Sequence, residues 1–131
     1  MTVPTIEARR QRKFIVMSTD QALLGVLRAA LPEGWQLVET LDLDDLGEFQ
    51  DILLHRFILL DLDDYAAFDP LDVIRKVRME YMLNVPIFCF GGASDVRDEA
   101  RLSRADRFFE RNEMVEKMLL FCHQYRWGES Q

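Results

Sequence analysis

The chain has 131 residues, of which 49% are hydrophobic and 30% are charged. This length and balance are typical of one folded domain, and they exclude a disordered chain and a pair of ordinary domains. Apolar runs such as residues 57–60 are too short to cross a membrane, and the polar, basic residues 2–13 do not resemble a secretory signal. We therefore expect a cytoplasmic protein with a single domain at residues 13–128, between polar tails at 1–12 and 129–131.

Charge is distributed unevenly along the chain, which carries a net −7. Residues 39–72 contain eleven acidic residues and one base, Arg56, so this segment carries −10 and the remainder carries +3. An acidic chain repels nucleic-acid phosphates, which argues against DNA or RNA as a partner. The acidic segment is expected to be mostly a solvated surface, with a basic protein partner as the alternative.

Cysteine and histidine do not form a recognisable metal or disulfide motif in this sequence. Cys89 and Cys122 lie in apolar surroundings and belong to no paired-cysteine motif, so we expect buried free thiols in a reducing compartment. His55 and His123 are far apart in the sequence, and we expect both on the surface and no metal site.

The apolar spacing alternates between strand-like runs and helix-like periods throughout the first half of the chain. Pro32, Glu33 and Gly34 stop the first helix, whose start Ser18, Thr19 or Asp20 can cap. The wholly apolar third strand indicates a central position in a parallel sheet. The predicted elements are a strand at 14–17, a helix at 20–31, a strand at 35–39, a helix at 43–55 with Leu46, Phe49 and Leu53 on its inner face, and a strand at 57–62.

The second half repeats this alternation. Asp69 and Pro70 form a cap and first-turn proline, and Ser94 and Asn112 are expected to cap the next two helices. The predicted elements are a helix from 70 to about 82 with Leu71, Ile74, Val77 and Tyr81 facing inward, a strand at 85–90, a helix at 94–104, a strand at 106–110 and a helix from 112 to about 127, followed by Gly128.

Strict alternation of strands and helices with short loops predicts an α/β protein with a parallel sheet covered on both faces. Five such units fit the flavodoxin-like strand order 2-1-3-4-5, as a three-layer sandwich with five helices. In such sheets the chemistry lies at the carboxyl ends of the strands. Here those ends are residues 18–20, 61–63, 91–92 and 111.

Three segments resemble the receiver domain of two-component response regulators, a CheY-like module, over residues 13–127. ILLDLDDY is similar to the third receiver strand, where an aspartate accepts a phosphoryl group, and Asp61 takes that place. NVPIFCFGGAS and ADRFFERN are similar to the fourth and fifth strands, and Phe108 takes the position of the family aromatic. The resemblance implies a cytoplasmic signalling module of a phosphorelay.

The residues that would form the receiver active site mostly depart from the family pattern. Ser18 and Thr19 replace the two acids that hold magnesium, Gly91 replaces the phosphate-binding hydroxyl, Arg111 replaces the lysine, and Asn112 replaces the proline. Asp20 comes one step too late to replace a ligand and is expected to begin a helix, whereas Asp63 or Asp64 could supply one ligand. Phosphoryl transfer to a carboxylate needs a cation to neutralise charge, so we expect no magnesium cofactor and no enzymatic turnover.

We therefore expect a stand-alone, degenerate receiver that acts through protein–protein contacts, with Arg111 paired to Asp61 as its counter-charge. A histidine kinase or a second copy would be its partner. One alternative is a genuine phosphoacceptor at Asp61, and another is a flavodoxin-like domain that binds a nucleotide or flavin, although no glycine-rich phosphate loop follows the first strand. A further alternative places an anion among Ser18, Thr19, Ser94 and the amides of Gly91 and Gly92.

The expected interaction face lies at residues 94–127. Arg97, Arg101 and Arg104 fall at helical spacing and form one stripe near Phe108, and a simple solvated face is the alternative. The last helix has more apolar residues than one buried stripe needs. Val115, Met118, Leu119 and Cys122 are expected to face the sheet, whereas Leu120 and Trp127 are expected to be exposed beside the arginines, either as contact residues or as extra packing.

Overall fold

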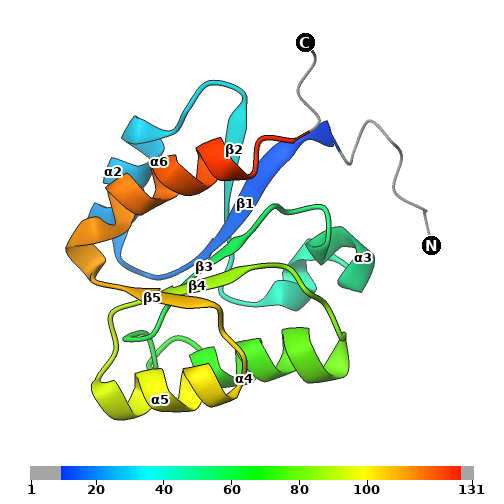
Figure 1. Cartoon of the computed structure of the whole chain (residues 1–131), viewed down its shortest axis with the longest axis vertical. Helices are drawn as coiled ribbons and strands as arrows, with labels where there is room; N and C mark the ends of the chain where they lie inside the picture. Colours follow the sequence, from blue (N-terminus) through cyan, green and yellow to red (C-terminus); the bar gives the residue numbers. More distant parts are fainter. Residues whose placement is uncertain (1–9, 128–131) are drawn as a thin grey trace.

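Five short strands pair in parallel to form one sheet in the computed structural model, which describes residues 10–127 (Figure 1). The strand order confirms the expected flavodoxin-like topology, with a helical region following each strand. The strands are β1 (Arg12–Met17), β2 (Trp35–Glu39), β3 (Ile58–Asp61), β4 (Ile87–Phe90) and β5 (Arg107–Phe109), in the order β2-β1-β3-β4-β5. The helices are α2 (Gln21–Ala30), η1 (Leu43–Leu46), α3 (Phe49–Ile52), α4 (Pro70–Arg75), η2 (Lys76–Glu80), α5 (Ser94–Leu102), η3 (Arg111–Glu113) and α6 (Met114–Gln124).

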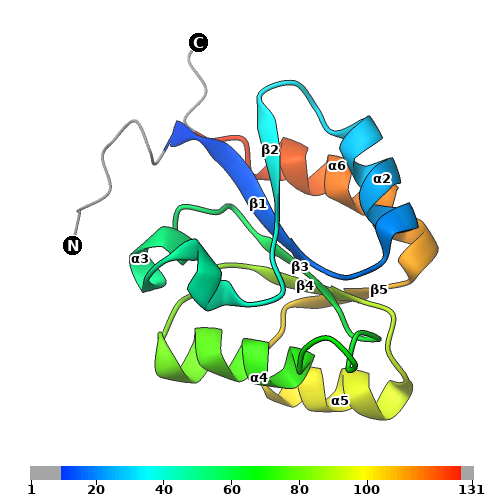
Figure 2. The same ribbon diagram turned by 180° about the vertical axis from the view of Figure 1, so that it is seen from behind.

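Helices cover both faces of the sheet, with α2 and α6 on one face and α3, α4 and α5 on the other (Figures 1 and 2). Alternate side chains of β1 enter the two resulting cores: Phe14 and Val16 pack under α2 and α6, and Ile15 and Met17 pack on the opposite side. β3 is buried along its whole length, as its unbroken apolar run predicts. No helix among residues 10–127 is long and apolar enough to cross a membrane.

The two cysteines are buried and unpaired, as expected. Cys89 belongs to the core on the α4 and α5 side of the sheet, whereas Cys122 belongs to the core on the α6 side. Burial raises the pKa of each thiol to about 12. Both side chains are therefore neutral packing residues.

The predicted helix at residues 43–55 is wrong in detail, because the structure divides it into η1 and α3. Gly47 interrupts it with φ +117°, and a Cβ there would lie 2.3 Å from Oδ2 of Asp51. That carboxylate accepts a hydrogen bond from the backbone N–H of Glu48 and so fixes the turn. The change of direction buries Leu43 and Ile52 instead of the face that we expected, and it leaves Phe49 and Leu53 exposed and Leu46 half-buried.

Helix starts also differ from expectation at two places. Asp69 does cap α4, with Oδ1 accepting from the N–H groups of Leu71 and Asp72 at 3.0 and 3.4 Å. Ser94, however, is the first residue of α5, and Ala93 precedes it without a side-chain cap. Asn112 lies inside η3, where Glu110 and Glu113 form reciprocal capping bonds ahead of α6. The predicted Gly128 stop lies outside the described residues.

The inner face of α6 is rotated relative to the prediction. Met118 and Cys122 are buried and Val115 is half-buried, as expected, but Leu119 is 41% exposed. Phe121 takes the inward position instead, stacked on Phe88 with ring centroids 3.9 Å apart. The sequence contains too many apolar residues on this helix to fix its rotation, and the aromatic packing decides it.

His55 is buried rather than on the surface, which corrects the sequence-based expectation. Its side chain lies at the end of α3, where Nδ1 donates to the carbonyl oxygens of Asp51 and Ile52 at 3.0 and 3.3 Å. Burial, assisted by the nearby charge of Lys13, lowers its pKa from 6.5 to about 4. The imidazole is therefore neutral in the folded protein at physiological pH.

This burial predicts a pH-dependent stability. Between pH 6.5 and about 4 the unfolded chain binds a proton at His55 that the folded chain does not. The contribution of His55 is therefore complete above pH 6.5, declines as the pH falls, and reaches a loss of at most about 3 kcal/mol near pH 4. Urea unfolding of wild type and His55→Gln across this range measures it. Parallel pH profiles for the two proteins would contradict the prediction.

Candidate functional site

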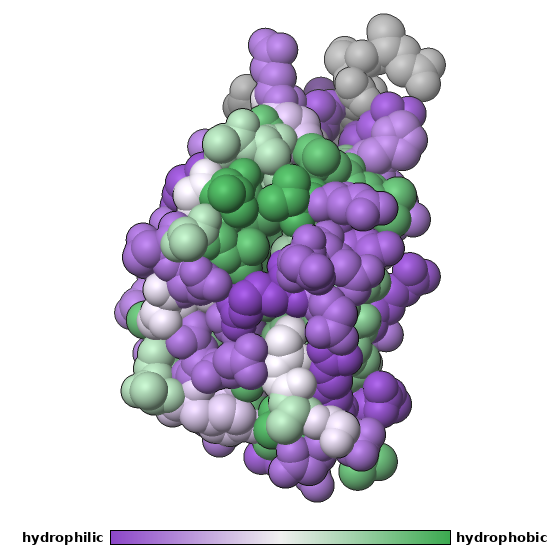
Figure 3. Space-filling view, turned by 90° about the vertical axis from the view of Figure 1, so that its left-hand side faces the viewer, coloured by the Kyte–Doolittle hydropathy of each residue, from purple (hydrophilic) through white to green (hydrophobic). Residues whose placement is uncertain are grey.

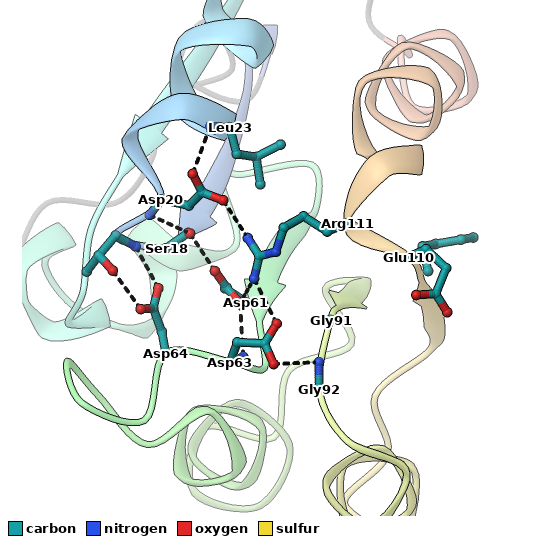
Figure 4. A network of polar contacts seen from close by, with 12 residues as sticks. Ser18, Asp20, Leu23, Asp61, Asp63, Asp64, Gly91, Gly92, Glu110 and Arg111 are labelled. Carbon is teal, nitrogen blue, oxygen red and sulfur yellow. Dashed lines mark hydrogen bonds and ion pairs between the residues drawn. The ribbon is translucent and has the colours of Figure 1, made fainter.

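Polar side chains from the ends of β1, β3 and β5 converge on Asp61, which is only 2% exposed (Figure 4). Oδ2 of Asp61 accepts from the hydroxyl of Ser18 at 2.7 Å. Oδ1 accepts from the backbone N–H of Asp63 at 2.9 Å and from Nη2 of Arg111 at 2.6 Å. The ion pair between Asp61 and Arg111 is thereby confirmed, and both carboxylate oxygens are engaged.

Arg111 forms ion pairs with three carboxylates and does not bind Asp61 through two parallel hydrogen bonds. Nη2 also contacts Oδ2 of Asp63 at 2.9 Å, and Nη1 contacts Oδ2 of Asp20 at 2.9 Å (Figure 4). Partial burial on its own would lower the pKa of Arg111, but the bonds to Asp61 and Asp63 outweigh it and raise that pKa. The guanidinium is thus a permanent positive charge at the centre of this site.

Asp20 and Asp64 hold the loop that follows β1 in place. Asp20 caps α2, as predicted, by accepting from the N–H of Leu23 at 3.0 Å while its other oxygen faces Arg111. Asp64 accepts from both the N–H and the hydroxyl of Thr19 at 2.6 Å. Burial opposes ionisation of Asp64, but these bonds prevail and lower its pKa. Ser18 and Thr19 are therefore hydrogen-bonded to carboxylates.

Two glycines after β4 contact Asp63 in different ways: Gly91 leaves room for its carboxylate and Gly92 donates its N–H to it. Gly91 has φ +70°, and a Cβ there would lie 2.2 Å from Oδ2 of Asp63. The N–H of Gly92 donates to Oδ1 of the same carboxylate at 3.0 Å, whereas the N–H of Gly91 donates to the carbonyl of Phe109. The anion niche that we considered is therefore wrong, because its amide donors already serve Asp63 and Phe109. A hydroxyl-bearing residue at position 91 would collide with Asp63.

The arginine stripe of α5 is divided among different roles. Arg97 turns inward, donating through Nε to the carbonyl of Gly91 at 2.8 Å and through Nη2 to Glu110. Arg101 is exposed, pairs with Asp98, and lies 4.8 Å above the ring of Phe108. Arg104 lies beyond the end of the helix with φ +78°. Only part of the stripe therefore faces solvent as one surface.

Trp127 is 56% exposed but does not lie beside these arginines, which corrects its expected place. The guanidinium of Arg56 stacks on its ring, with the guanidinium carbon 3.3 Å from the ring centroid. Arg56 lies just before the start of β3. Leu120, on α6, is exposed as expected. Figure 3 shows apolar side chains gathered over one part of the molecule and a polar band below them; Val26 on α2 and Leu119 on α6 are among the exposed apolar residues.

A second polar network, centred on Arg78, gave no recognisable signal in the sequence. The side chain is 8% exposed and donates to the carbonyls of Leu83, Val85 and Arg104 and to Oδ2 of Asp106, at 2.7–3.0 Å. This network ties the segment before β4 to the segment before β5.

Within residues 10–127, no group of three or more histidine, cysteine or acidic side chains is arranged to hold a metal ion.

No protein-family model and no curated protein matches this sequence. Solved structures, however, match the fold closely. A response-regulator signal receiver domain from Bermanella marisrubri is 23% identical, with 86% of this chain and 96% of that chain covered and a TM-score of 0.66. The phosphorylated cyanobacterial phytochrome response regulator RcpA is 14% identical, with 92% and 97% covered and a TM-score of 0.71.

A response regulator in red light signaling of R. palustris is similar in the same way, at 17% identity, with 91% of this chain and 96% of that chain covered and a TM-score of 0.65. These likenesses extend over nearly the whole described chain. The protein therefore has the CheY-like fold of response-regulator receiver domains. One fold can carry different functions, so the function depends on the residues of the site.

Proposed function

We propose that the protein is a receiver-like signalling module that works through protein–protein contacts, without conventional magnesium-dependent phosphorylation of Asp61. The observation that carries this proposal is the guanidinium of Arg111 bound at 2.6 Å to Oδ1 of Asp61. The hydroxyl of Ser18 donates a hydrogen bond to the other oxygen of Asp61. A carboxylate that is bound on both oxygens and nearly inaccessible is a poor nucleophile for an incoming phosphoryl donor.

The residues around Asp61 do not fit a magnesium ion. Magnesium needs oxygen ligands in near-octahedral geometry, whereas the carboxylates of Asp61 and Asp64 already accept the hydroxyls of Ser18 and Thr19. The positive charge that a metal would supply is already present as Arg111, in contact with Asp20, Asp61 and Asp63. We therefore propose that the module has no magnesium cofactor and no enzymatic turnover. Its resting state would be fixed by the internal cation.

The partner in this proposal is another protein of a cytoplasmic signalling pathway, either a histidine kinase or a second copy of the chain. The net charge of −7 disfavours nucleic acid. The exposed residues Arg101, Leu102 and Leu120 offer contact points on α5 and α6, the face expected from the sequence. Phosphorylation of Asp61 remains the rival function, and it is directly testable.

Amide NMR spectra and intact mass, recorded with Mg²⁺ and with acetyl phosphate or beryllofluoride, separate the proposal from this rival. We expect the amide resonances of Ser18, Leu62 and Gly91 to stay unchanged when the reagents are added, and the mass to show no added phosphoryl group. The reason is that Arg111 and Ser18 are bound to the two oxygens of Asp61. A conventional receiver treated in parallel controls for the reagents. Calorimetry should find magnesium affinity weaker than about 1 mM, since both oxygens of Asp61 are already hydrogen-bonded and one of them is paired with Arg111. Sub-millimolar affinity, or a phosphoryl adduct, that disappears in Asp61→Asn would refute the proposal.

A further inference from the structure

An acid-rimmed groove lies on the side of the sheet that carries α3 and α4. It is formed between the loop after β2 and the first turns of α4, and its volume is about 490 Å³. Leu43, Phe68 and Val73 provide apolar surface, and Asp42, Asp69 and Asp72 line it with carboxylates. A pocket of this size and mixed character is suited to an apolar group that carries positive charge at its edge.

The negative charge of this acidic groove is fixed in place and largely uncompensated. Asp42 and Asp69 accept backbone N–H bonds at 3.0 Å, which hold their carboxylates at the starts of η1 and α4. Lys76 is the one base among the residues that line the groove, and it pairs with Asp44 at 2.8 Å. Within residues 10–127, Asp42, Asp69 and Asp72 have no ion-pair partner in the structure. The groove therefore attracts cationic surfaces.

The end of α5 presents the complementary charge beside an exposed apolar side chain. Leu102 is 78% exposed, although most large aliphatic side chains of this protein are buried. Three arginines and one aspartate occupy residues 101–107, and the aspartate, Asp106, is neutralised by Arg78. This basic corner, defined as Arg101, Leu102, Arg104 and Arg107, thus combines one exposed apolar side chain with three arginines within seven residues, of which Arg101 also pairs with Asp98.

The basic corner is also rigidly supported. Nε of Arg78 donates to the carbonyl of Arg104 at 3.0 Å, and Nη2 of Arg104 donates to the carbonyl of Arg78 at 3.3 Å. These reciprocal bonds join the middle of η2 to the turn that follows α5. A surface held in this way loses little conformational entropy on binding, which favours association.

The two surfaces lie at opposite edges of one helical layer. α4 begins at the carboxyl edge of the sheet because it follows β3, whereas α5 ends at the amino edge because it precedes β5 (Figure 2). The basic corner of one chain therefore cannot reach its own groove. We propose that it binds the acidic groove of a second copy, so that the protein self-associates head to tail. This inference relies on the proposed function only in treating the chain as a protein-binding module.

Sedimentation of the full chain at low and high salt tests the proposal. We expect the average mass to rise beyond that of a dimer between about 20 µM and 1 mM protein, because each added copy still presents one free groove and one free corner. The association should weaken at about 0.5 M salt, where charges are screened. A wild-type chain that stays monomeric under both conditions would overturn the proposal, but it would leave the phosphorylation test unaffected.

Matched variants locate the two halves of the contact. Leu102→Asp should abolish association at the corner, and Leu41→Lys, at an exposed position that lines the groove, should abolish it at the groove. Val26→Asp and Phe49→Lys make the same changes at exposed apolar positions elsewhere and should associate like wild type. Amide NMR dispersion verifies that each variant is folded.

Mixing the two defective variants gives the decisive result. Leu102→Asp retains an intact groove and Leu41→Lys retains an intact corner, so the mixture should form a one-to-one complex that grows no further. A mixture that remains monomeric, although wild type associates, would show that the contact is not corner-to-groove. Binding of an arginine-rich peptide by the groove, without self-association of wild type, would identify a different protein as the occupant and also overturn the proposal.

Discussion

Arg111→Met is expected to lower the free energy of unfolding by about 2–3 kcal/mol at neutral pH, because it removes the counter-charge from a buried carboxylate. Asp61 is 2% exposed, and Asp20 and Asp63 contact the same guanidinium. Methionine keeps most of the side-chain volume but leaves three carboxylates facing one another. The effect is smaller than for a fully buried pair because a third of the Arg111 side chain is exposed. Urea unfolding, with the slope checked for two-state behaviour, measures the loss.

The reciprocal change should cost less. In Asp61→Asn the amide oxygen can replace Oδ1 and accept from the N–H of Asp63, and the amide NH2 can donate to the hydroxyl oxygen of Ser18. Arg111 retains Asp20 and Asp63 as partners. We expect a loss of about 1 kcal/mol or less. Equal losses for the two variants, or an Arg111→Met protein as stable as wild type, would contradict the role of Arg111 as the required counter-charge.

Asp61 should also be dispensable for binding in a module of this kind. Asp61→Ala is expected to destabilise the fold modestly, or not at all, and to leave self-association unchanged. If this variant folds but no longer binds, Asp61 acts as a switch, and the phosphoacceptor function becomes the better explanation. Sedimentation beside wild type provides the measurement.

Arg78→Met should have the largest effect on stability, a loss of about 3–5 kcal/mol, because it breaks a buried and fully bonded charge. The substitution removes donors from the carbonyls of Leu83, Val85 and Arg104 and leaves Asp106 without its cation. The oxygen of Asp106 would retain only the backbone N–H of Ile87. Unpaired carbonyls between two strands are costly because water does not reach them readily.

A neighbouring arginine provides the control for this prediction. Arg75 lies one turn earlier, is exposed, and forms no ion pair in the described structure, so Arg75→Met should change stability by about 0.5 kcal/mol or less. Thermal and urea unfolding of both variants give the comparison. Similar losses at positions 75 and 78 would mean that the buried network contributes little beyond helix propensity.

Local pattern was sufficient to predict the strand order, because each strand and helix has its own apolar period and short loops leave few alternative topologies. It also placed Asp61 and Arg111 at one edge of the sheet, where a buried acid needs a cation. The sequence did not indicate that Arg111 would also bind Asp20 and Asp63. Those contacts span 91 and 48 residues and depend on how three loops are shaped.

Length, the apolar periods and the charged residues at strand ends thus determined the receiver-like fold and the pairing of Asp61 with Arg111. Tertiary structure alone decided which side chains fill the remaining space. Gly47 divides the helical region between β2 and β3, Gly91 leaves room for Asp63, and Phe121 rather than Leu119 enters the core. His55 and Arg78 are both buried, and backbone carbonyls accept their N–H groups. The contacts of Arg78 with Arg104 and Asp106 join segments that no local period relates, so they form only when the packed layers bring those segments together.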